Sequence, residues 1–225
     1  HLAKHNEKIV GATAAMPSGT GLSELIELYP KRFWDVAIAE QHAVTSMAAL
    51  AKEGFKPFCT IYSTFLQRGY DQIIHDTCLM DLPVVFALDR AGIVGEDGET
   101  HQGVFDISFL RAIPNMTLFA PRDERSFHQA MAFAAQYKHP CSLRYPRGSF
   151  IETDLSESLP FRLAKSQLLR SSSSDILFIG YGNGVGRAYQ SAEFLDTQVS
   201  ILDLRFVKPL DEDMLIDLAK KHKKW

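Results

Sequence analysis

The chain has 225 residues, of which 46% are hydrophobic and 23% are charged, and its formal net charge at pH 7 is −3. This composition is typical of a globular protein with one large domain or two smaller ones. The small negative charge gives no indication of a nucleic-acid partner. The sequence has no apolar run long enough to cross a bilayer and no secretory signal at its start, so we expect no membrane partner.

The cysteines are few and widely spaced. Cys59, Cys78 and Cys141 are odd in number and lie in apolar surroundings. This favours buried free thiols in a reducing compartment over a disulfide framework or a thiolate metal site. Because the first residue is His1 and not Met, we also expect the chain to be a piece of a longer protein.

Short apolar runs alternate with helical patterns along the first two thirds of the chain. This alternation predicts an α/β fold: a doubly wound, mostly parallel sheet with helices on both faces. One helix is predicted over about 123–137, where Pro121 precedes an apolar stripe at helical spacing. The predicted strands are Lys8–Ala15, Asp35–Ala39, Pro57–Tyr62, Pro83–Asp89, Thr117–Pro121 and Cys141–Tyr145.

A carboxylate stands where one predicted strand ends and a helix begins. Glu40 directly follows the strand Asp35–Ala39 and precedes an alanine-rich amphipathic pattern. Open α/β sheets bind ligands at the carboxyl ends of their strands, so we expect the side chain of Glu40 to be presented there and not packed away. A glutamate in a first helical turn is also favourable for the helix dipole, so this segment alone does not establish a function.

The strand that ends at Tyr62 leads into another predicted helix, for which Ser63 is a suitable N-cap. Tyr62, Phe65 and Arg68 recur at intervals of three and are predicted to share a face that looks toward the same end of the sheet as Glu40. The alternative is that Phe65 belongs to the core and Arg68 is an ordinary surface charge. This helix alone does not decide between them.

Residues 89–106 combine four glycines with aspartate, histidine and arginine and are unlike a core segment. Loops at the carboxyl ends of strands often carry function, so we predict that this is the catalytic loop, with Asp97 and His101 as its candidate residues. We do not expect a metal site here, because the calcium-loop pattern is absent and one histidine beside acids is weak support for zinc.

Three arginines also follow predicted strands. Arg68, Arg90 and Arg147 each lie just beyond a strand's carboxyl end, and those ends share one edge of a parallel sheet. Because a guanidinium group matches phosphate oxygens with two hydrogen bonds, this clustering predicts a bound phosphate group.

The last third of the chain changes in composition. Residues 151–174 are rich in Ser, Glu, Pro and Lys and are predicted to be a linker. Residues 175–225 are predicted to form a second, incomplete α/β unit with two strands, Ile176–Gly180 and Val199–Leu204.

A glycine-rich segment, Gly180–Gly186, follows the first of these strands and superficially resembles a dinucleotide-binding loop. Its spacing is G-x-G-x-G where the fingerprint requires G-x-G-x-x-G, and Asp203 is the only acid at the end of the next strand. We therefore interpret the segment as a structural turn between strand and helix.

Four segments together resemble the 1-deoxy-D-xylulose-5-phosphate synthase family of transketolase-like thiamine diphosphate enzymes, in both order and spacing. The resemblance covers nearly the whole chain and implies a pyrimidine-binding domain over 1–150, followed by the opening of a C-terminal domain. The family's N-terminal domain, whose Gly-Asp-Gly and Asn motif binds magnesium and diphosphate, has no counterpart in the chain. The four segments are Asp35–His42, Ile61–Arg68, Asp89–Gly103 and Arg144–Gly148.

The resemblance implies condensation of pyruvate with D-glyceraldehyde 3-phosphate to 1-deoxy-D-xylulose 5-phosphate and carbon dioxide. This reaction is the first step of non-mevalonate isoprenoid synthesis and feeds thiamine and pyridoxal synthesis. Glu40 matches the acid that hydrogen-bonds the coenzyme's pyrimidine N1′, Phe65 matches the residue that stacks on that ring, and Met16 would line the same pocket. Two further groups are implied: Tyr62, Arg68, Arg90 and Arg147 for the substrate phosphate, and Asp97 and His101 facing the bound intermediate.

The family also implies a Mg²⁺ ion whose ligands lie in the missing N-terminal domain, and a homodimer when the protein is complete. We expect a bacterial cytoplasmic protein, or a plastid protein that has lost its targeting peptide, and we expect the 225 residues alone to be inactive. Two alternatives stay open. One is a transketolase or a 2-oxo acid dehydrogenase β subunit, against which the run Tyr62–Arg68 argues; the other is a non-catalytic isolated domain.

Overall fold

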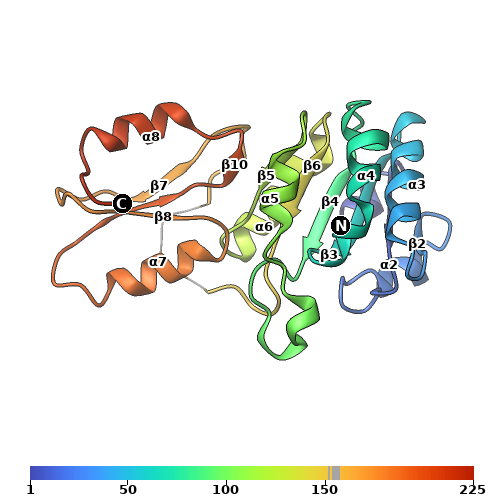
Figure 1. Ribbon diagram of the computed structural model, residues 1–225, viewed down its shortest axis with the longest axis horizontal. Helices are drawn as coiled ribbons and strands as arrows, with labels where there is room; N and C mark the ends of the chain where they lie inside the picture. The colour runs from blue at the N-terminus through green and yellow to red at the C-terminus, as the bar shows by residue number, and fades with distance from the viewer. Residues whose placement is uncertain (152, 154–157) are drawn as a thin grey trace. The chain divides into compact units, whose positions relative to one another are not determined.

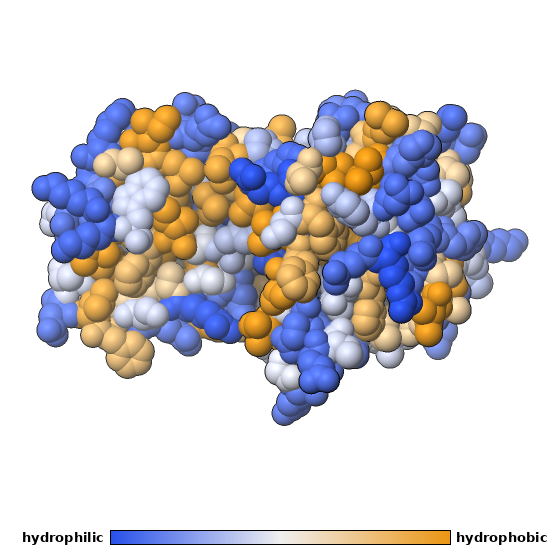
Figure 2. Space-filling model, viewed as in Figure 1, coloured by the Kyte–Doolittle hydropathy of each residue, from blue (hydrophilic) through white to orange (hydrophobic). Residues whose placement is uncertain are grey.

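The computed structural model separates into two compact units (Figure 1). It describes residues 1–151, 153 and 158–225. Unit 1 consists of His1–Leu118 and Ala134–Arg147, and unit 2 consists of Phe119–Phe133 and Gly148–Trp225. Hydrophilic and hydrophobic residues are interspersed over the face shown in Figure 2. Within the described residues, the structure contains no helix with the length and apolarity needed to cross a membrane.

Unit 1 is built on one sheet with the strand order β5-β6-β4-β3-β1-β2. The pairs β2·β1, β1·β3, β3·β4 and β4·β6 are all parallel. Every residue of β1, β3 and β4 is buried, so both faces of the central strands are covered, as the α/β prediction requires. The strands are β1 (Ile9–Thr13), β2 (Phe33–Asp35), β3 (Lys56–Tyr62), β4 (Val85–Asp89), β5 (Thr117–Phe119) and β6 (Cys141–Arg144).

Helix α3 (Glu40–Lys52) contacts β1 and β3 through an apolar stripe that includes the fully buried Ala43 and Val44. Helix α6 (Glu124–Gln136) lies where a helix was predicted, and Ala130 and Ala134 of its stripe are fully buried. Residues 124–133 of α6 belong to unit 2. Besides α3, the helical segments of unit 1 are α1 (Leu2–His5), α2 (Ser23–Leu28), α4 (Tyr70–Gln72), α5 (Asp106–Arg111), the 3₁₀ turns η1 (Phe65–Gly69), η3 (Gly95–Asp97) and η4 (Glu99–His101), and the π turn η2 (Ile73–Cys78).

The strand predicted at Asp35–Ala39 is wrong, because β2 ends where that prediction begins. The Oδ1 atom of Asp35 accepts hydrogen bonds from the backbone nitrogens of Ala15 (2.7 Å) and Ala37 (3.0 Å). Ala37 takes a left-handed φ of 58°. This side-chain bonding replaces the strand ladder with a turn. Glu40 therefore begins α3 after a turn of four residues.

The N-cap predicted at Ser63 is also wrong. The chain after β3 forms η1, α4 and η2 in succession instead of one regular helix. Thr64 is at the N-cap position of η1, and its side chain makes no capping hydrogen bond to the backbone. Within the described residues, the buried hydroxyl of Ser63 has no hydrogen-bond partner. Its position reflects the return of the loop at Gly103, where an added Cβ would lie 2.7 Å from that hydroxyl.

Unit 2 contains a three-stranded sheet with the order β7-β9-β8, in which β9 is antiparallel to β7 and parallel to β8. Helices α7 and α8 lie on opposite sides of this sheet (Figure 1). Leu202 of β9 packs with Leu218 of α8, whereas the adjacent Ile201 packs with Ala192 of α7. The elements are β7 (Gln167–Arg170), β8 (Leu177–Gly180), α7 (Gly184–Ala192), β9 (Ser200–Asp203), β10 (Phe206–Lys208) and α8 (Glu212–Ala219).

The prediction for this unit needs two corrections. Part of the predicted linker, 151–174, is strand β7, and β10 is a further strand that was not predicted. Residues 152 and 154–157 of the predicted linker lie outside the described residues. The pairing of β7 with β9 joins segments about thirty residues apart, so the local Ser-rich composition did not indicate it. The domain boundaries stay a prediction.

The glycine-rich segment forms a turn between β8 and α7, as predicted. An added Cβ at Gly180 would lie 2.5 Å from the Cα of Val185, so the close approach of helix and strand requires glycine there. Asp203 is fully buried and accepts hydrogen bonds from Arg122 Nη1 and from the backbone nitrogen of Arg205, both at 3.1 Å. The acid that a ribose would need is thus a structural partner of two arginines.

The three cysteines are buried, and none of them forms a disulfide. Burial raises the pKa of Cys59 and of Cys141 to about 12. Because the thiolate is the reactive form, we expect negligible alkylation of both residues in the folded protein at pH 8 and complete alkylation after unfolding. Their contribution to folding stability should be full below pH 9 and be lost as the pH rises toward 12. Mass spectrometry after iodoacetamide treatment measures the first effect, and rapid labelling of the native protein would contradict it.

Candidate active site

The predicted site residues follow strand ends that lie at one edge of the sheet in unit 1. In the parallel register Thr13 pairs with Asp35, and Tyr62 pairs with Asp89. The segments after β1, β2, β3 and β4 therefore all start at the same edge. Met16 lies in the turn after β1, where its carbonyl accepts hydrogen bonds from the backbone and hydroxyl groups of Thr20.

Glu40 is buried in the first turn of α3, with 2% of its surface exposed, so the expectation of a presented carboxylate is wrong. Its Oε2 atom lies 3.5 Å from Nη1 of Arg68, whose side chain is 60% exposed. A pair so open to solvent contributes little attraction. Within the described residues, Oε2 accepts no hydrogen bond. A buried acceptor without a donor is costly in a protein, so this atom is suited to a donor on a ligand.

Three aromatic rings gather beside the strand end. The rings of Tyr62 and Phe65 are stacked, with centroids 5.5 Å apart and planes at 16°. The His101 ring stands edge-on to Phe65 at 5.1 Å and lies 6.0 Å from Tyr62. The turn after β1 also reaches this group, because an added Cβ at Gly19 would collide with the Tyr62 hydroxyl. The flat rings, from different segments, form a surface suited to stacking a planar ligand.

Arg90 ties three of these segments together. Its guanidinium lies 4.2 Å from the centroid of the Tyr62 ring, its Nη1 donates to the Gly19 carbonyl at 2.9 Å, and the same atom lies 3.0 Å from Asp89 Oδ2. The backbone of Arg90 has a left-handed φ of 56°, which is uncommon for a residue with a side chain and turns the chain away from β4. Burial raises the pKa of the Asp89 carboxyl, and the charge of Arg90 opposes that rise.

Asp97 lies between two arginines. Its Oδ1 accepts a hydrogen bond from Arg147 Nε at 2.8 Å, and its Oδ2 accepts one from Arg90 Nε at 3.3 Å. Desolvation opposes ionisation of Asp97, but the hydrogen bonds and charges of Arg147 and then of Arg90 hold its pKa below the ordinary value. Arg90 and Arg147 thus share one carboxylate, whereas Arg68 pairs with Glu40.

The loop that carries these residues closes on itself through glycine. Gly92 and Gly103 exchange backbone hydrogen bonds of 2.7 and 2.9 Å. An added Cβ at Gly103 would lie 2.1 Å from the Arg90 carbonyl oxygen, so the closure requires glycine at this position. Sequence reasoning did not single out Gly19, Asp89 or Gly103. Asp89 and Gly103 are the ends of a segment that it identified, and the only signal for Gly19 is its position three residues after Met16.

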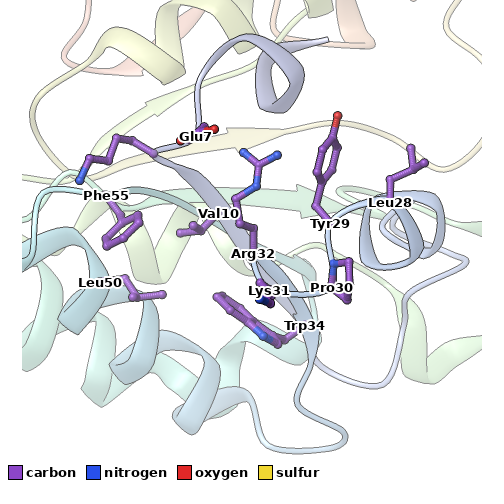
Figure 3. Close-up of a pocket in the computed structure, with 11 residues that line it drawn as sticks. Glu7, Val10, Leu28, Tyr29, Pro30, Lys31, Arg32, Trp34, Leu50 and Phe55 are labelled. Carbon is purple, nitrogen blue, oxygen red and sulfur yellow. The ribbon is translucent and has the colours of Figure 1, made fainter.

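A separate hollow of about 950 Å³ lies at the opposite end of the sheet, before the first residues of β1, β2 and β3 (Figure 3). Tyr29, Arg32, Trp34, Leu50 and Phe55 are among its lining residues, and none of the predicted site residues lines it. Among the described residues of the whole chain, no group of three or more His, Cys, Asp or Glu side chains is placed to hold a metal ion.

The sequence of the chain matches two known protein families. Residues 1–151 match the family described as "Transketolase, pyrimidine binding domain". The chain belongs to the transketolase family. Residues 164–225 match "Transketolase, C-terminal domain", so both units carry transketolase-type sequence.

Two curated relatives of this transketolase-family chain are 1-deoxy-D-xylulose-5-phosphate synthases. That of Sulfurimonas denitrificans is 84% identical over 225 residues, and that of Nitratiruptor sp. is 65% identical over 224 residues. Each alignment covers 100% of the chain but 37% of the relative, so the chain spans little more than a third of these proteins. A solved structure, "Split gene transketolase, inactive beta4 tetramer", superposes with a TM-score of 0.86 at 26% identity, covering 98% of this chain and 73% of that one.

Proposed function

We propose that the protein of which this chain is a part is a 1-deoxy-D-xylulose-5-phosphate synthase. It would condense pyruvate with D-glyceraldehyde 3-phosphate, form 1-deoxy-D-xylulose 5-phosphate and release carbon dioxide. The observation that carries this proposal is the buried Glu40 carboxylate, with an oxygen that accepts no hydrogen bond from the described residues, at the sheet edge that also bears Phe65 and Arg90. The 84% identity to the Sulfurimonas denitrificans enzyme supports it.

The residues present fit the pyrimidine ring of thiamine diphosphate. Glu40 supplies an acceptor without a donor among the described residues, and Phe65 supplies a ring on the segment that follows β3. Met16 in the turn after β1 would complete the lining. When bound, this coenzyme supplies the electron sink for decarboxylation of pyruvate.

The part played by Glu40 follows from its burial. In the proposed role, Oε2 of Glu40 would hold a proton in a hydrogen bond to the pyrimidine N1′, and this bond would favour the tautomer of the bound coenzyme whose exocyclic nitrogen is a base. A hydrogen bond in a site from which water is excluded is stronger than the same bond in solvent.

The aldehyde substrate would bind through its phosphate. Arg90 and Arg147 offer two guanidinium groups already drawn together by Asp97, and Tyr62 lies against the first of them. Arg68 is proposed for the same phosphate from the neighbouring segment. His101, edge-on to Phe65, is proposed to face the acceptor hydroxyl groups together with Asp97.

Four further properties are proposed for the whole protein. Mg²⁺ would be held by ligands in the remaining part of the protein, and the complete protein would be a homodimer in the bacterial cytoplasm. The product would enter isoprenoid, thiamine and pyridoxal synthesis. Transketolase activity is the competing proposal. It is suggested by the solved split-gene transketolase, to which the chain is 26% identical. The 84% identity to the Sulfurimonas denitrificans synthase argues against it.

The test is a turnover assay on the full-length protein. We expect release of carbon dioxide from pyruvate that depends on D-glyceraldehyde 3-phosphate, with 1-deoxy-D-xylulose 5-phosphate as product. Transfer of a two-carbon unit between sugar phosphates without use of pyruvate would identify a transketolase instead. The absence of both reactions would reject the proposed function.

Substitution of Arg147 should separate the two substrates. In the full-length protein, Arg147→Ala should raise the KM for D-glyceraldehyde 3-phosphate by about ten- to a hundredfold, because a charge-assisted hydrogen bond to one phosphate is lost. The KM for pyruvate should change little, since pyruvate carries no phosphate. Arg125→Ala, an exposed arginine of α6, is the matched control. Equal losses for both substrates would indicate general damage to the site.

A further inference from the structure

The carboxylate between the two phosphate-binding candidates is unusual in its placement. Asp97 presents one oxygen to Arg147 Nε and the other to Arg90 Nε, at 2.8 and 3.3 Å. These are the donors that a phosphate group would use. Asp97 therefore occupies the arginine pair in much the way that an anionic ligand would.

We propose that Asp97 is an intramolecular competitor that sets the affinity of the Arg90–Arg147 pair for anions. This inference rests on the proposed function, which assigns the two arginines to the substrate phosphate. A ligand must displace Asp97 before it binds both arginines. The apparent dissociation constant is then the intrinsic one divided by the fraction of molecules in which the pair is free.

The surrounding geometry allows this displacement. Arg90 is held independently of Asp97, by the Gly19 carbonyl, Asp89 and the Tyr62 ring, so it stays in position when Asp97 leaves. Asp97 lies in a turn between Gly95 and Gly98, which have φ values of 63° and 84°. An added Cβ at either glycine would meet nothing within 4 Å, so both ends of the turn border open space.

The consequence is a site that weak anions do not fill. A monocarboxylate such as pyruvate replaces Asp97 like for like and gains little. A phosphate group, with about 1.5 to 2 negative charges and three acceptor oxygens at pH 7, forms additional bonds that Asp97 does not make. Asp97 thus lowers the affinity for every anion by one common factor. Only anions that bind strongly then have an apparent dissociation constant below their own concentration, and only these occupy the site.

The experiment titrates the 225-residue chain with inorganic phosphate and, separately, with acetate. Binding is followed by the NMR signals of the arginine Nε–H groups in the wild type, in Asp97→Asn and in Glu96→Gln. Asn keeps an acceptor oxygen but loses the charge, and Glu96 is the exposed acid one residue earlier in the same turn. We expect Asp97→Asn to tighten both anions by the same factor, about tenfold, and Glu96→Gln to change neither.

Three outcomes of this titration would overturn the proposal. Unchanged or weaker phosphate binding in Asp97→Asn would mean that Asp97 holds the arginines in position and does not compete. Asp97→Asn could also increase the affinity for phosphate by the square of the factor by which it increases the affinity for acetate. That result would mean that Asp97 stays in place and repels each ligand in proportion to its charge. Phosphate binding that leaves the Arg90 and Arg147 signals unmoved in the wild type would also reject it.

A second measurement does not depend on the variant's folding. In the wild type, the carboxyl carbon signal of Asp97 should titrate at a higher pH when phosphate saturates the pair, because the arginine contacts are then lost; an unchanged titration rejects displacement. The readout is separate from turnover. If the protein is an active synthase and Asp97→Asn binds phosphate no more tightly than the wild type, only the competition by Asp97 is rejected. If Asp97 competes but the protein has no synthase activity, only the proposed function is rejected.

Discussion

Replacing Glu40 by Gln in the full-length protein should lower turnover by orders of magnitude and leave the fold intact. Gln has the same shape, so the packing of the buried side chain changes little. Its amide cannot hold the shared proton, and the loss should exceed the ~10²–10⁴ that is typical of one general acid–base group, because generation of the reactive coenzyme depends on it. The measurements are kcat with both substrates and the thermal unfolding midpoint.

The control for this prediction lies on the same helix. Glu53, the exposed residue that follows α3 at its other end, should be replaceable by Gln without loss of kcat. Glu40→Ala removes the side chain altogether and tests the role of the carboxylate without a substitute. Near-normal turnover by a folded Glu40→Ala enzyme would remove the basis of the proposed function.

The second prediction with a large expected effect is about the 225-residue chain tested alone. The 225 residues alone should show no turnover and no tight binding of thiamine diphosphate with Mg²⁺. Two neutral contacts, a hydrogen bond at Glu40 and a ring stacked on Phe65, would have to offset several kcal/mol of association entropy without the anchored diphosphate. Calorimetry of the chain with the coenzyme and Mg²⁺ measures this directly.

Addition of the remaining part of the protein as a separate chain should restore both binding and turnover. Tight, magnesium-dependent binding by the 225 residues alone would contradict the prediction. It would point either to a metal site in the acidic turn Glu96–Glu99 or to a second copy of the chain that completes the pocket. Replacement of Glu96 and Glu99 by Gln distinguishes these two explanations, since it removes only the first.

Local pattern was sufficient for the class of fold and for which segments start at one edge of the sheet. Alternating strands and helices predicted a parallel α/β sheet, because burial on both faces makes the strands apolar throughout. Once the strands are parallel, the residues after them share an edge. Tyr62, Arg90 and Arg147 were therefore predicted to lie near one another from their distance to a strand end alone, and contacts with Arg90 and Asp97 bring them into one cluster.

The errors arose where distant groups compete with local preference. Asp35 bonds the backbone of Ala15, twenty residues away, and so ends β2 before the predicted strand begins. Strand β7 forms because β9 supplies its hydrogen-bond partners, although its composition resembles that of a linker. Propensity describes a segment by itself, and such pairings override it.

The chemistry of the site shows the same division. The spacing of the motifs indicates that Glu40, Asp97 and the arginines follow strand ends at one edge of the sheet. It does not indicate that Glu40 is buried with a free acceptor oxygen, or that Asp97 lies between two guanidinium groups. Those properties depend on which side chains from separate segments meet, on the distances between them and on the water that their packing excludes, and these are set only when the whole chain has folded.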